Sequence, residues 1–214
     1  RTFTLAAPDL LTLLLGPALA ERVFGEGSGL GLSLMGLSRD LPDALETGAV
    51  DCAIVPRMEG VEANLRNDLL QKVLFRDRLR CFARVGHPAM PKRRLSLERY
   101  LGLRHVLVSP GGRGPGPVDL ALAARGEARH VSVRVPDFAA AINIVSRSDL
   151  VIAAPSALAQ AVPPGSLMSF DLPLPVEGHA ITLVWHPRYG SDPDHTWFRD
   201  VLLEELDGAR LGLA

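Results

Sequence analysis

Cysteine, aromatic residues and long apolar runs are all scarce in this chain of 214 residues. The two cysteines, Cys52 and Cys81, have no CxxC spacing, which excludes a disulfide framework and a cysteine-based zinc site. Both fall in apolar stretches typical of buried strands, so we expect free thiols in a reducing, cytoplasmic compartment. The longest apolar run, residues 10–20, is too short to span a bilayer, which takes about 20 residues.

The apolar run at residues 10–20 has two interpretations. A short apolar stretch that ends in small residues imitates a secretory signal. Against that, Asp9 directly precedes the run, Arg1 is the only cation upstream, and a strand pattern at residues 2–6 comes before both. We therefore favour a structural helix. Because the chain starts at Arg1 and not at Met, we expect a fragment of a longer protein or a processed form.

Charge of neither sign is in excess, since 23 Lys and Arg residues stand against 24 Asp and Glu residues. This balance argues against a nucleic-acid-binding surface spread over the whole chain. The hydrophobic fraction of 47% excludes a disordered chain. At roughly 100–200 residues per domain, the length indicates one large domain or two small ones.

Apolar strands and helices alternate in two separate parts of the chain, which predicts an α/β fold with parallel strands. In the first part we expect strands at residues 2–6, 30–37 and 51–55 and helices at 10–24 and 41–47. In the second we expect strands at 105–109, 130–135 and 149–154 and helices at 118–125, 138–146 and 155–161. The remaining expected elements are strands at 69–75, 78–85, 168–172 and 180–185 and a last helix at 195–206.

Polar residues and glycines mark the ends of these helices, because short polar side chains accept first-turn amide protons and glycine adopts the left-handed conformation. We expect caps at Asp9, Ser96 and Asp137, at Ser38 or Asp40, and at Asp192 or Asp194, with a glycine end at Gly48.

No catalytic or cofactor motif is present. There is no GxSxG, and the glycine-rich stretches at 25–31 and 111–116 fit neither the dinucleotide fingerprint nor the P-loop. We interpret both as loops, although Arg113 and the amides of the second stretch could face an anion. We therefore expect no cofactor and no enzyme.

One polar cluster near the end of the chain leaves two interpretations open. His186, Asp192, Asp194 and His195 include residue types that hold hard or borderline metals. An aspartate-rich loop that caps the last helix explains the same residues, and we favour that structural role with no metal.

Ligands of open α/β sheets bind beyond the carboxyl ends of the strands, near helix starts. On this sequence the rule selects residues 7–9, 37–39, 109–111 and 136–138, each of which follows an expected strand.

The order of several segments resembles the effector-binding domain of LysR-type transcriptional regulators, in the branch of nodulation and aromatic-catabolism regulators. No single motif carries the resemblance; the ordered set does, and it covers essentially the whole chain. The segments are RTFTLAAPDLLTLLLGPAL, LETGAVDCAIVP, LFRDRLRCFARVGHPAM, LSLERY, RHVLVSPGG, VPDFAAAINIVSRSDLVIAAPSALA and LVWHPRYGSDPDHTWFRDVL.

The resemblance implies a fold like that of type 2 periplasmic binding proteins, with two Rossmann-like α/β lobes joined by two crossover strands. It suggests residues 1–83 and 187–214 for lobe I and 84–186 for lobe II. Family members carry an N-terminal winged helix-turn-helix, which is absent from this chain, so DNA would be bound only through that missing domain. The implied partners are a small effector, aromatic or carboxylic, in a cleft between the lobes, and further copies in a homodimer or homotetramer, with no membrane.

The family's effector contacts carry over to three loops and a helix start. In many members Ser or Thr hydroxyls follow the first strand; here Ala7, Pro8 and Leu10 stand there and offer no hydroxyl. The full implied set of ligand-binding residues is Ala7, Pro8, Asp9, Leu10, Leu37, Ser38, Arg39, Ser109, Pro110, Gly111, Pro136 and Phe138.

Two other functions remain open at this stage. A solute-binding component of a transporter would have the same lobed fold, and a signal peptide upstream would favour it. An enzyme on this architecture would need a nucleophile, base or metal, none of which the sequence offers.

Overall fold

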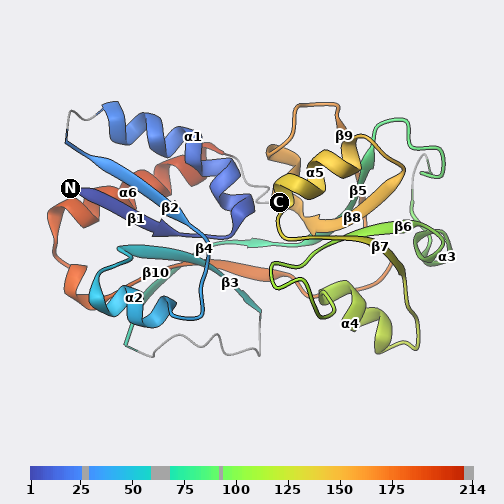
Figure 1. The fold of residues 1–214 in the computed structure, drawn as a ribbon, viewed down its shortest axis with the longest axis horizontal. Coiled ribbons are helices and arrows are strands. Elements are labelled where there is room, and N and C mark those ends of the chain that lie inside the picture. The colour runs from blue at the N-terminus through green and yellow to red at the C-terminus, as the bar shows by residue number, and fades with distance from the viewer. Residues whose placement is uncertain (26–28, 59–67, 92–93, 210–214) are drawn as a thin grey trace. The chain divides into compact units, whose positions relative to one another are not determined.

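A computed structural model describes residues 1–25, 29–58, 68–91 and 94–209 of the chain (Figure 1). The described chain divides into two compact units. Unit 1 comprises Arg1–Asp77 and His179–Ala214, and unit 2 comprises Arg78–Gly178. Each unit contains one five-stranded sheet.

The sheet of unit 1 has the order β2-β1-β3-β10-β4. Strands β1, β2 and β3 run parallel, whereas β10 runs antiparallel to β3 and β4. The elements of unit 1 are β1 (Thr2–Ala6), α1 (Asp9–Gly25), β2 (Gly31–Met35), α2 (Leu41–Thr47), β3 (Cys52–Met58), β4 (Leu70–Asp77), β10 (His179–Trp185), the short 3-10 helix η2 (Pro187–Tyr189) and α6 (Pro193–Gly208).

Helices cover both faces of this sheet (Figure 1). Alternate side chains of β1 point to opposite faces: Phe3 and Leu5 are buried on one face and Ala6 is buried on the other, whereas Thr2 at the start of the strand is exposed. Phe3 stacks on Phe198 of α6 with ring centroids 4.6 Å apart. Ala6 belongs instead to the cluster that Leu41 and Leu45 of α2 form on the other face.

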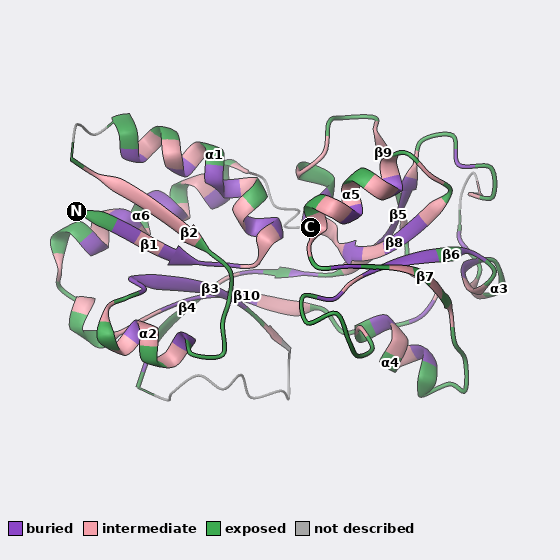
Figure 2. Cartoon of the chain, in the orientation of Figure 1, coloured by how far each residue is buried: buried purple, intermediate pink, exposed green. Residues whose placement is uncertain are grey.

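The sheet of unit 2 has the order β7-β6-β8-β5-β9, with β6, β7 and β8 parallel and β5 antiparallel to its neighbours β8 and β9. Its elements are β5 (Leu79–Arg84), α3 (Leu97–Leu101), β6 (Arg104–Val108), α4 (Pro117–Ala123), β7 (His130–Val135), α5 (Phe138–Ser146), β8 (Leu150–Pro155), the 3-10 helix η1 (Ser156–Gln160) and β9 (Leu167–Asp171). The core on the side of α3 and α4 includes Cys81, Tyr100 and Leu122, and strands β5, β6 and β8 are largely buried (Figure 2).

The chain leaves and re-enters unit 1 at neighbouring residues. Asp77, the last residue of β4, pairs with His179, the first residue of β10. The expected boundaries at 83/84 and 186/187 fall later than the divisions at 77/78 and 178/179. The physical reason is strand pairing, because β5 bonds to β8 and β9 in unit 2, whereas β10 bonds to β3 and β4 in unit 1.

Most expected elements are confirmed, with corrections at a few ends. Helix α1 begins at Asp9, so Asp9 lies in its first turn and Pro8 occupies the cap position; the Pro8 carbonyl accepts from the amides of Leu11 and Thr12 at 3.0 and 3.1 Å. Strand β2 ends at Met35, before the expected Leu37. The expected short helix at 155–161 is a 3-10 helix.

The other expected helix ends agree with the structure, except that the expected side-chain cap of α2 is not formed. Asp137, Ser96 and Asp192 each accept a first-turn amide proton through their side chains. Asp40 precedes α2 without a side-chain cap bond, and Gly48 ends α2 at a φ of +82°, a left-handed conformation that glycine adopts without strain. Both cysteines are buried and free, as expected.

Candidate functional site

Unit 1 brings together two of the loops that the sequence selects. The Ala7 amide donates to the Met35 carbonyl at 2.9 Å, immediately after the parallel pair Ala6 and Met35. Residues 7–10 and residues 37–39 therefore lie beyond the same edge of the sheet, at the carboxyl ends of β1 and β2.

The side chains of these two unit 1 loops differ in the groups that they offer a ligand. Ala7 and Leu10 are buried in the protein, at 1% and 3% exposure. Pro8 and Asp9 are half-buried, whereas Leu37, Ser38 and Arg39 are exposed. The exposed loop after β2 thus offers a hydroxyl and a guanidinium, and the turn after β1 offers mainly backbone.

Unit 2 brings together the other selected residues. The Ser109 amide donates to the Val135 carbonyl at 2.8 Å, next to the parallel pair Val108 and Val135. Residues 109–111 and 136–138 therefore lie beyond the carboxyl ends of β6 and β7. Pro110, Gly111 and Pro136 are exposed there.

Ser109 is held within its own loop, whereas Phe138 lies at the start of a capped helix. Ser109 is almost buried, and its hydroxyl donates to the Arg113 carbonyl at 2.9 Å, so it is occupied within its own loop. Phe138 opens α5 and is half-buried, with the Asp137 carboxylate accepting from the Ala140 amide at 2.7 Å in the same turn. The first turn of α5 has further amide protons that its own backbone does not bind, which favours an anionic group nearby.

The twelve predicted residues thus form two sets, one within each unit. Each set occupies the position where open α/β sheets bind ligands. Contact of these residues with an effector remains a prediction.

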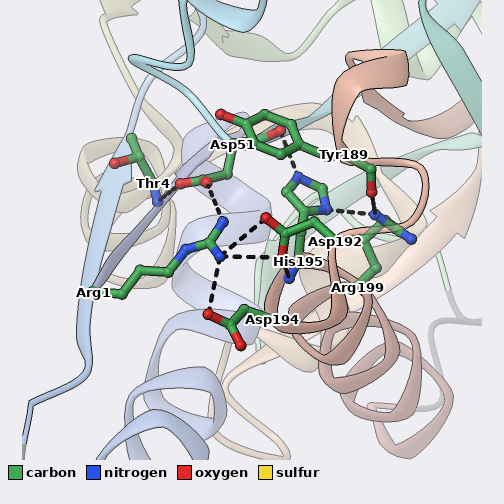
Figure 3. Close-up of polar contacts among 8 residues, drawn as sticks. All are labelled: Arg1, Thr4, Asp51, Tyr189, Asp192, Asp194, His195 and Arg199. Atoms are coloured by element: carbon green, nitrogen blue, oxygen red, sulfur yellow. Dashed lines mark hydrogen bonds and ion pairs between the residues drawn. The ribbon is translucent and has the colours of Figure 1, made fainter.

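The predicted polar cluster near the end of the chain has a structural role. Three of its four residues, Asp192, Asp194 and His195, belong to a group that we call the Arg1 cluster: Arg1, Thr4, Asp51, Tyr189, Asp192, Asp194, His195 and Arg199 (Figure 3). The fourth residue, His186, caps η2, where its Nδ1 accepts from the Arg188 amide at 3.2 Å. One nitrogen of the Arg1 guanidinium lies 3.2 Å from Asp192 and 3.1 Å from Asp194, and the other lies 3.5 Å from Asp51. These contacts tie β1, the start of β3 and the start of α6 together.

His195 of the Arg1 cluster is buried and engaged at both ring nitrogens. Its Nε2 donates to the Asp51 carbonyl at 2.9 Å, and its Nδ1 accepts from the Arg199 guanidinium. Among the residues that the structure describes, no group of three or more His, Cys, Asp and Glu side chains could hold a metal. Asp192 accepts from the His195 amide at 3.0 Å and caps α6, which agrees with the helix-capping interpretation.

A second polar cluster, in unit 2, was missed by sequence reasoning. We call it the Arg129 cluster, formed by Tyr100, His105, Asp119 and Arg129. The Arg129 side chain is only 2% exposed, and its Nε donates to Asp119 at 2.6 Å. Its Nη1 donates to the Tyr100 hydroxyl at 3.2 Å. The spacing of Gly116 and Asp119 at a helix start was a weak signal for this site, because an acidic third residue often accepts an amide proton from the cap.

Burial shifts the titration of the Arg129 cluster. His105 is fully buried, and burial together with the Arg129 charge lowers its pKa to about 4. Burial opposes ionisation of Asp119, but hydrogen bonds from Arg129 and the Gly116 amide hold the pKa of that carboxyl below its usual value. At neutral pH the cluster therefore holds a neutral imidazole beside a carboxylate–guanidinium pair.

Comparison with known proteins gives the same family throughout. The family profile described as the LysR substrate binding domain matches residues 1–207. The HTH-type transcriptional activator NahR of Pseudomonas putida is 32% identical over 206 residues, 95% of this chain and 67% of that protein. Nodulation protein D 1 of Rhizobium tropici is 29% identical over 217 residues, 100% of this chain and 67% of that protein.

Solved structures agree with this result. The probable transcriptional regulator PA0477 from Pseudomonas aeruginosa has a TM-score of 0.78 at 29% identity, covering 97% of this chain and 67% of that one. The regulatory domain of MexT, a transcriptional activator of the same species, has a TM-score of 0.77 at 24% identity, covering 95% and 99%. The MexT likeness supports the fold alone. None of these four proteins is named as a transporter component or an enzyme.

Proposed function

This chain belongs to the family of LysR substrate-binding domains, and from that premise we propose that it senses a small aromatic or carboxylic effector through the loops that follow β1, β2, β6 and β7. The observation that carries the proposal is the gathering of exposed loop residues beyond the carboxyl ends of parallel strands in each unit. Effector binding would change how a regulator presents its DNA-binding module.

The distribution of charge supports an anionic effector. Unit 2 contains 13 Lys and Arg residues against seven Asp and Glu residues, whereas unit 1 contains ten against 17. The near-neutral chain thus consists of one acidic and one basic unit. A basic unit raises the local concentration of anions near its loops. In unit 1, Arg39 is the exposed cation within the predicted set.

We extend the proposal to the rest of the regulator. The chain spans about two thirds of the length of NahR, whose name includes a helix-turn-helix. A DNA-binding module in the longer protein, a homodimer or homotetramer and a cytoplasmic location are therefore proposed together. No helix among the described residues has the length and hydropathy that crossing a membrane requires.

Thermal melting with a panel of benzoate, hydroxybenzoates and small dicarboxylates tests the effector class. A ligand at about 100 times its dissociation constant stabilises the folded protein by roughly 2.7 kcal/mol, which raises the melting temperature. We expect at least one acid of the panel to do so. If no acid shifts the melting temperature at millimolar concentration, the proposed effector class is wrong.

A pair of matched variants tests the location. Phe138→Ala removes an aromatic side chain at the start of α5, and Leu120→Ala removes an apolar side chain on α4 that is 57% exposed. We expect Phe138→Ala to weaken binding of the active acid about tenfold and Leu120→Ala to leave it within twofold. Equal affinities of both variants would contradict the assignment of Phe138 to the site.

A further inference from the structure

The loop of residues 109–116, which we call the glycine loop, has little means of holding its own shape. Four of its eight residues are glycine, and Gly112 and Gly114 have φ values of +68° and +86°. Glycine loses more conformational freedom on folding than any other residue. One backbone hydrogen bond, from the Gly112 amide to the Ser109 carbonyl at 2.8 Å, closes a turn at the start of the loop. Beyond that turn, a defined conformation depends on side-chain contacts.

Three side-chain hydrogen bonds hold the glycine loop, one along each part of it. The Ser109 hydroxyl donates to the Arg113 carbonyl, and the exposed Arg134 guanidinium donates to the Gly114 carbonyl, each at 2.9 Å. The Gly116 amide donates to the Asp119 carboxylate at 2.7 Å. The contact to Asp119 is the shortest of the three and fixes the end of the loop against α4.

Asp119 is itself held by a buried cation from another element. Its second oxygen accepts from Arg129 Nε at 2.6 Å, while Arg129 Nη1 donates to the Tyr100 hydroxyl. Tyr100 belongs to α3 and is fully buried, and Arg129 directly precedes β7. A buried charge is retained only when it is paired and hydrogen-bonded. The Arg129 guanidinium therefore restricts Asp119 to one orientation.

Gly116 lies close to the strand from which the loop departs. A Cβ atom at this position would lie 2.9 Å from the Cδ1 atom of Leu107 on β6, so a larger residue would displace the Leu107 side chain. A small displacement of Asp119 would release the Gly116 amide and loosen the glycine loop next to residues 109–111.

We propose that Asp119 and Arg129 are positioning residues for effector binding, which act by fixing the shape of the glycine loop. The inference rests on the proposed function, because the glycine loop includes three of the predicted effector contacts. It adds two residues outside the predicted contact set, the buried Arg129 side chain and the half-buried Asp119. Their role differs from ordinary helix capping, because Arg129 connects the cap of α4 to α3 and the start of β7.

The test combines two measurements on the whole chain. Asp119→Asn keeps an oxygen that accepts from Gly116 but loses the ionic bond with Arg129. Leu122→Ala is the control, since Leu122 lies on the same helix, is fully buried and belongs to the apolar core of unit 2. Arg129→Lys is the second variant, because its ammonium can replace one of the two Arg129 contacts at a time. Titration with benzoate measures affinity, and amide NMR shifts of Gly111, Gly112 and Gly114 report the loop.

We expect Asp119→Asn to weaken benzoate binding at least tenfold and to shift all three glycine resonances. Arg129→Lys should give an intermediate change in both. Leu122→Ala should lower the melting temperature but leave affinity within twofold and the resonances in place. Wild-type affinity and unshifted glycines in both Asp119→Asn and Arg129→Lys would overturn the inference and leave the proposed function intact.

Failure of the proposed function gives a different result. If the wild-type chain binds neither benzoate nor any other acid of the panel, the effector class is wrong. The glycine resonances still decide whether Asp119 and Arg129 fix the loop. If Asp119→Asn does not fold, Arg129→Lys supplies both readouts.

Discussion

The two units each contain a cluster of arginine, aspartate and histidine, but the clusters differ in burial. In the Arg1 cluster the side chains of Arg1 and Asp192 are each 29% exposed and Asp194 is 67% exposed. In the Arg129 cluster the Arg129 side chain is 2% exposed and forms its ion pair with Asp119. Three carboxylates contact Arg1, so the loss of one still leaves it with ionic partners. Within the Arg129 cluster, Asp119 is the one carboxylate that pairs with Arg129.

Because of this difference in burial, the same residue types contribute differently to the stability of the two units. Water screens and solvates the Arg1 cluster, so its ion pairs contribute little individually. Around Arg129 a lost partner leaves an uncompensated charge in the interior. Removing each arginine and protonating each histidine tests whether the two clusters contribute differently to stability.

Arg129→Ala should have the largest effect. Removing one partner of a buried pair typically costs about 3–5 kcal/mol, and Tyr100 also loses a donor to its hydroxyl. We expect the free energy of unfolding, measured by urea titration at pH 7, to fall by about 3 kcal/mol. A loss below about 1 kcal/mol would show that the two clusters are energetically alike.

Protonation of the two histidines at acid pH should affect folding stability to different extents. The pKa of His105 is about 4 in the folded chain, against an ordinary value of about 6.5 for a histidine in an unfolded chain. Because the unfolded state binds the proton more tightly, stability is complete above about pH 6.5 and falls as the pH drops towards 4, by up to about 3 kcal/mol. His105→Gln keeps a donor for the Tyr100 carbonyl and should flatten this loss in urea titrations at pH 7 and pH 4.5.

His195 is the control for that measurement. Burial lowers the pKa of His195 as well, and the charges of Arg199 and Arg1 act in the same direction, but the hydrogen bond to the Asp51 carbonyl and the Asp51 charge oppose them. We therefore expect His195→Gln to change the acid sensitivity less than His105→Gln does. The opposite ranking would mean that the histidine of the Arg1 cluster controls acid unfolding.

Arg1→Ala should have the smallest effect. Asp192 still caps α6 through the His195 amide, and Asp51 still accepts from the Thr4 amide at 2.7 Å. We expect a loss within about 1 kcal/mol that shrinks further in 1 M NaCl, because exposed ion pairs are screened. Urea titration at low and high salt measures both values, and a loss as large as that of Arg129→Ala would refute the comparison.

The sequence predicted local features well, because local chemistry determines them. Asp137 caps α5 and Gly48 ends α2 as their residue types require. Asp9 was misplaced by one position, since a proline carbonyl can open a helix without a side-chain cap. The residue patterns and the family resemblance together also predicted two units of α/β type.

Features that depend on distant residues were harder to predict. The direction of β10 depends on its pairing with β3 and β4, and nothing within residues 180–185 specifies it. The Arg129 cluster joins residues from α3, α4 and the approach to β7, none of which carries a local motif. The loop positions at strand ends could be selected because sheet topology alone places them.

The pairing of Asp77 with His179 makes unit 2 an insertion with adjacent entry and exit points. In an antiparallel pair such ends are close enough for a two-residue type I′ turn to join them. Residues 78–178 are therefore inserted, like an exchangeable cassette, between two antiparallel strands that a short turn could otherwise join. Recombination could exchange such a cassette for another while leaving the host sheet and its strand order unchanged, which offers a simple route to new sensory specificity on a retained scaffold.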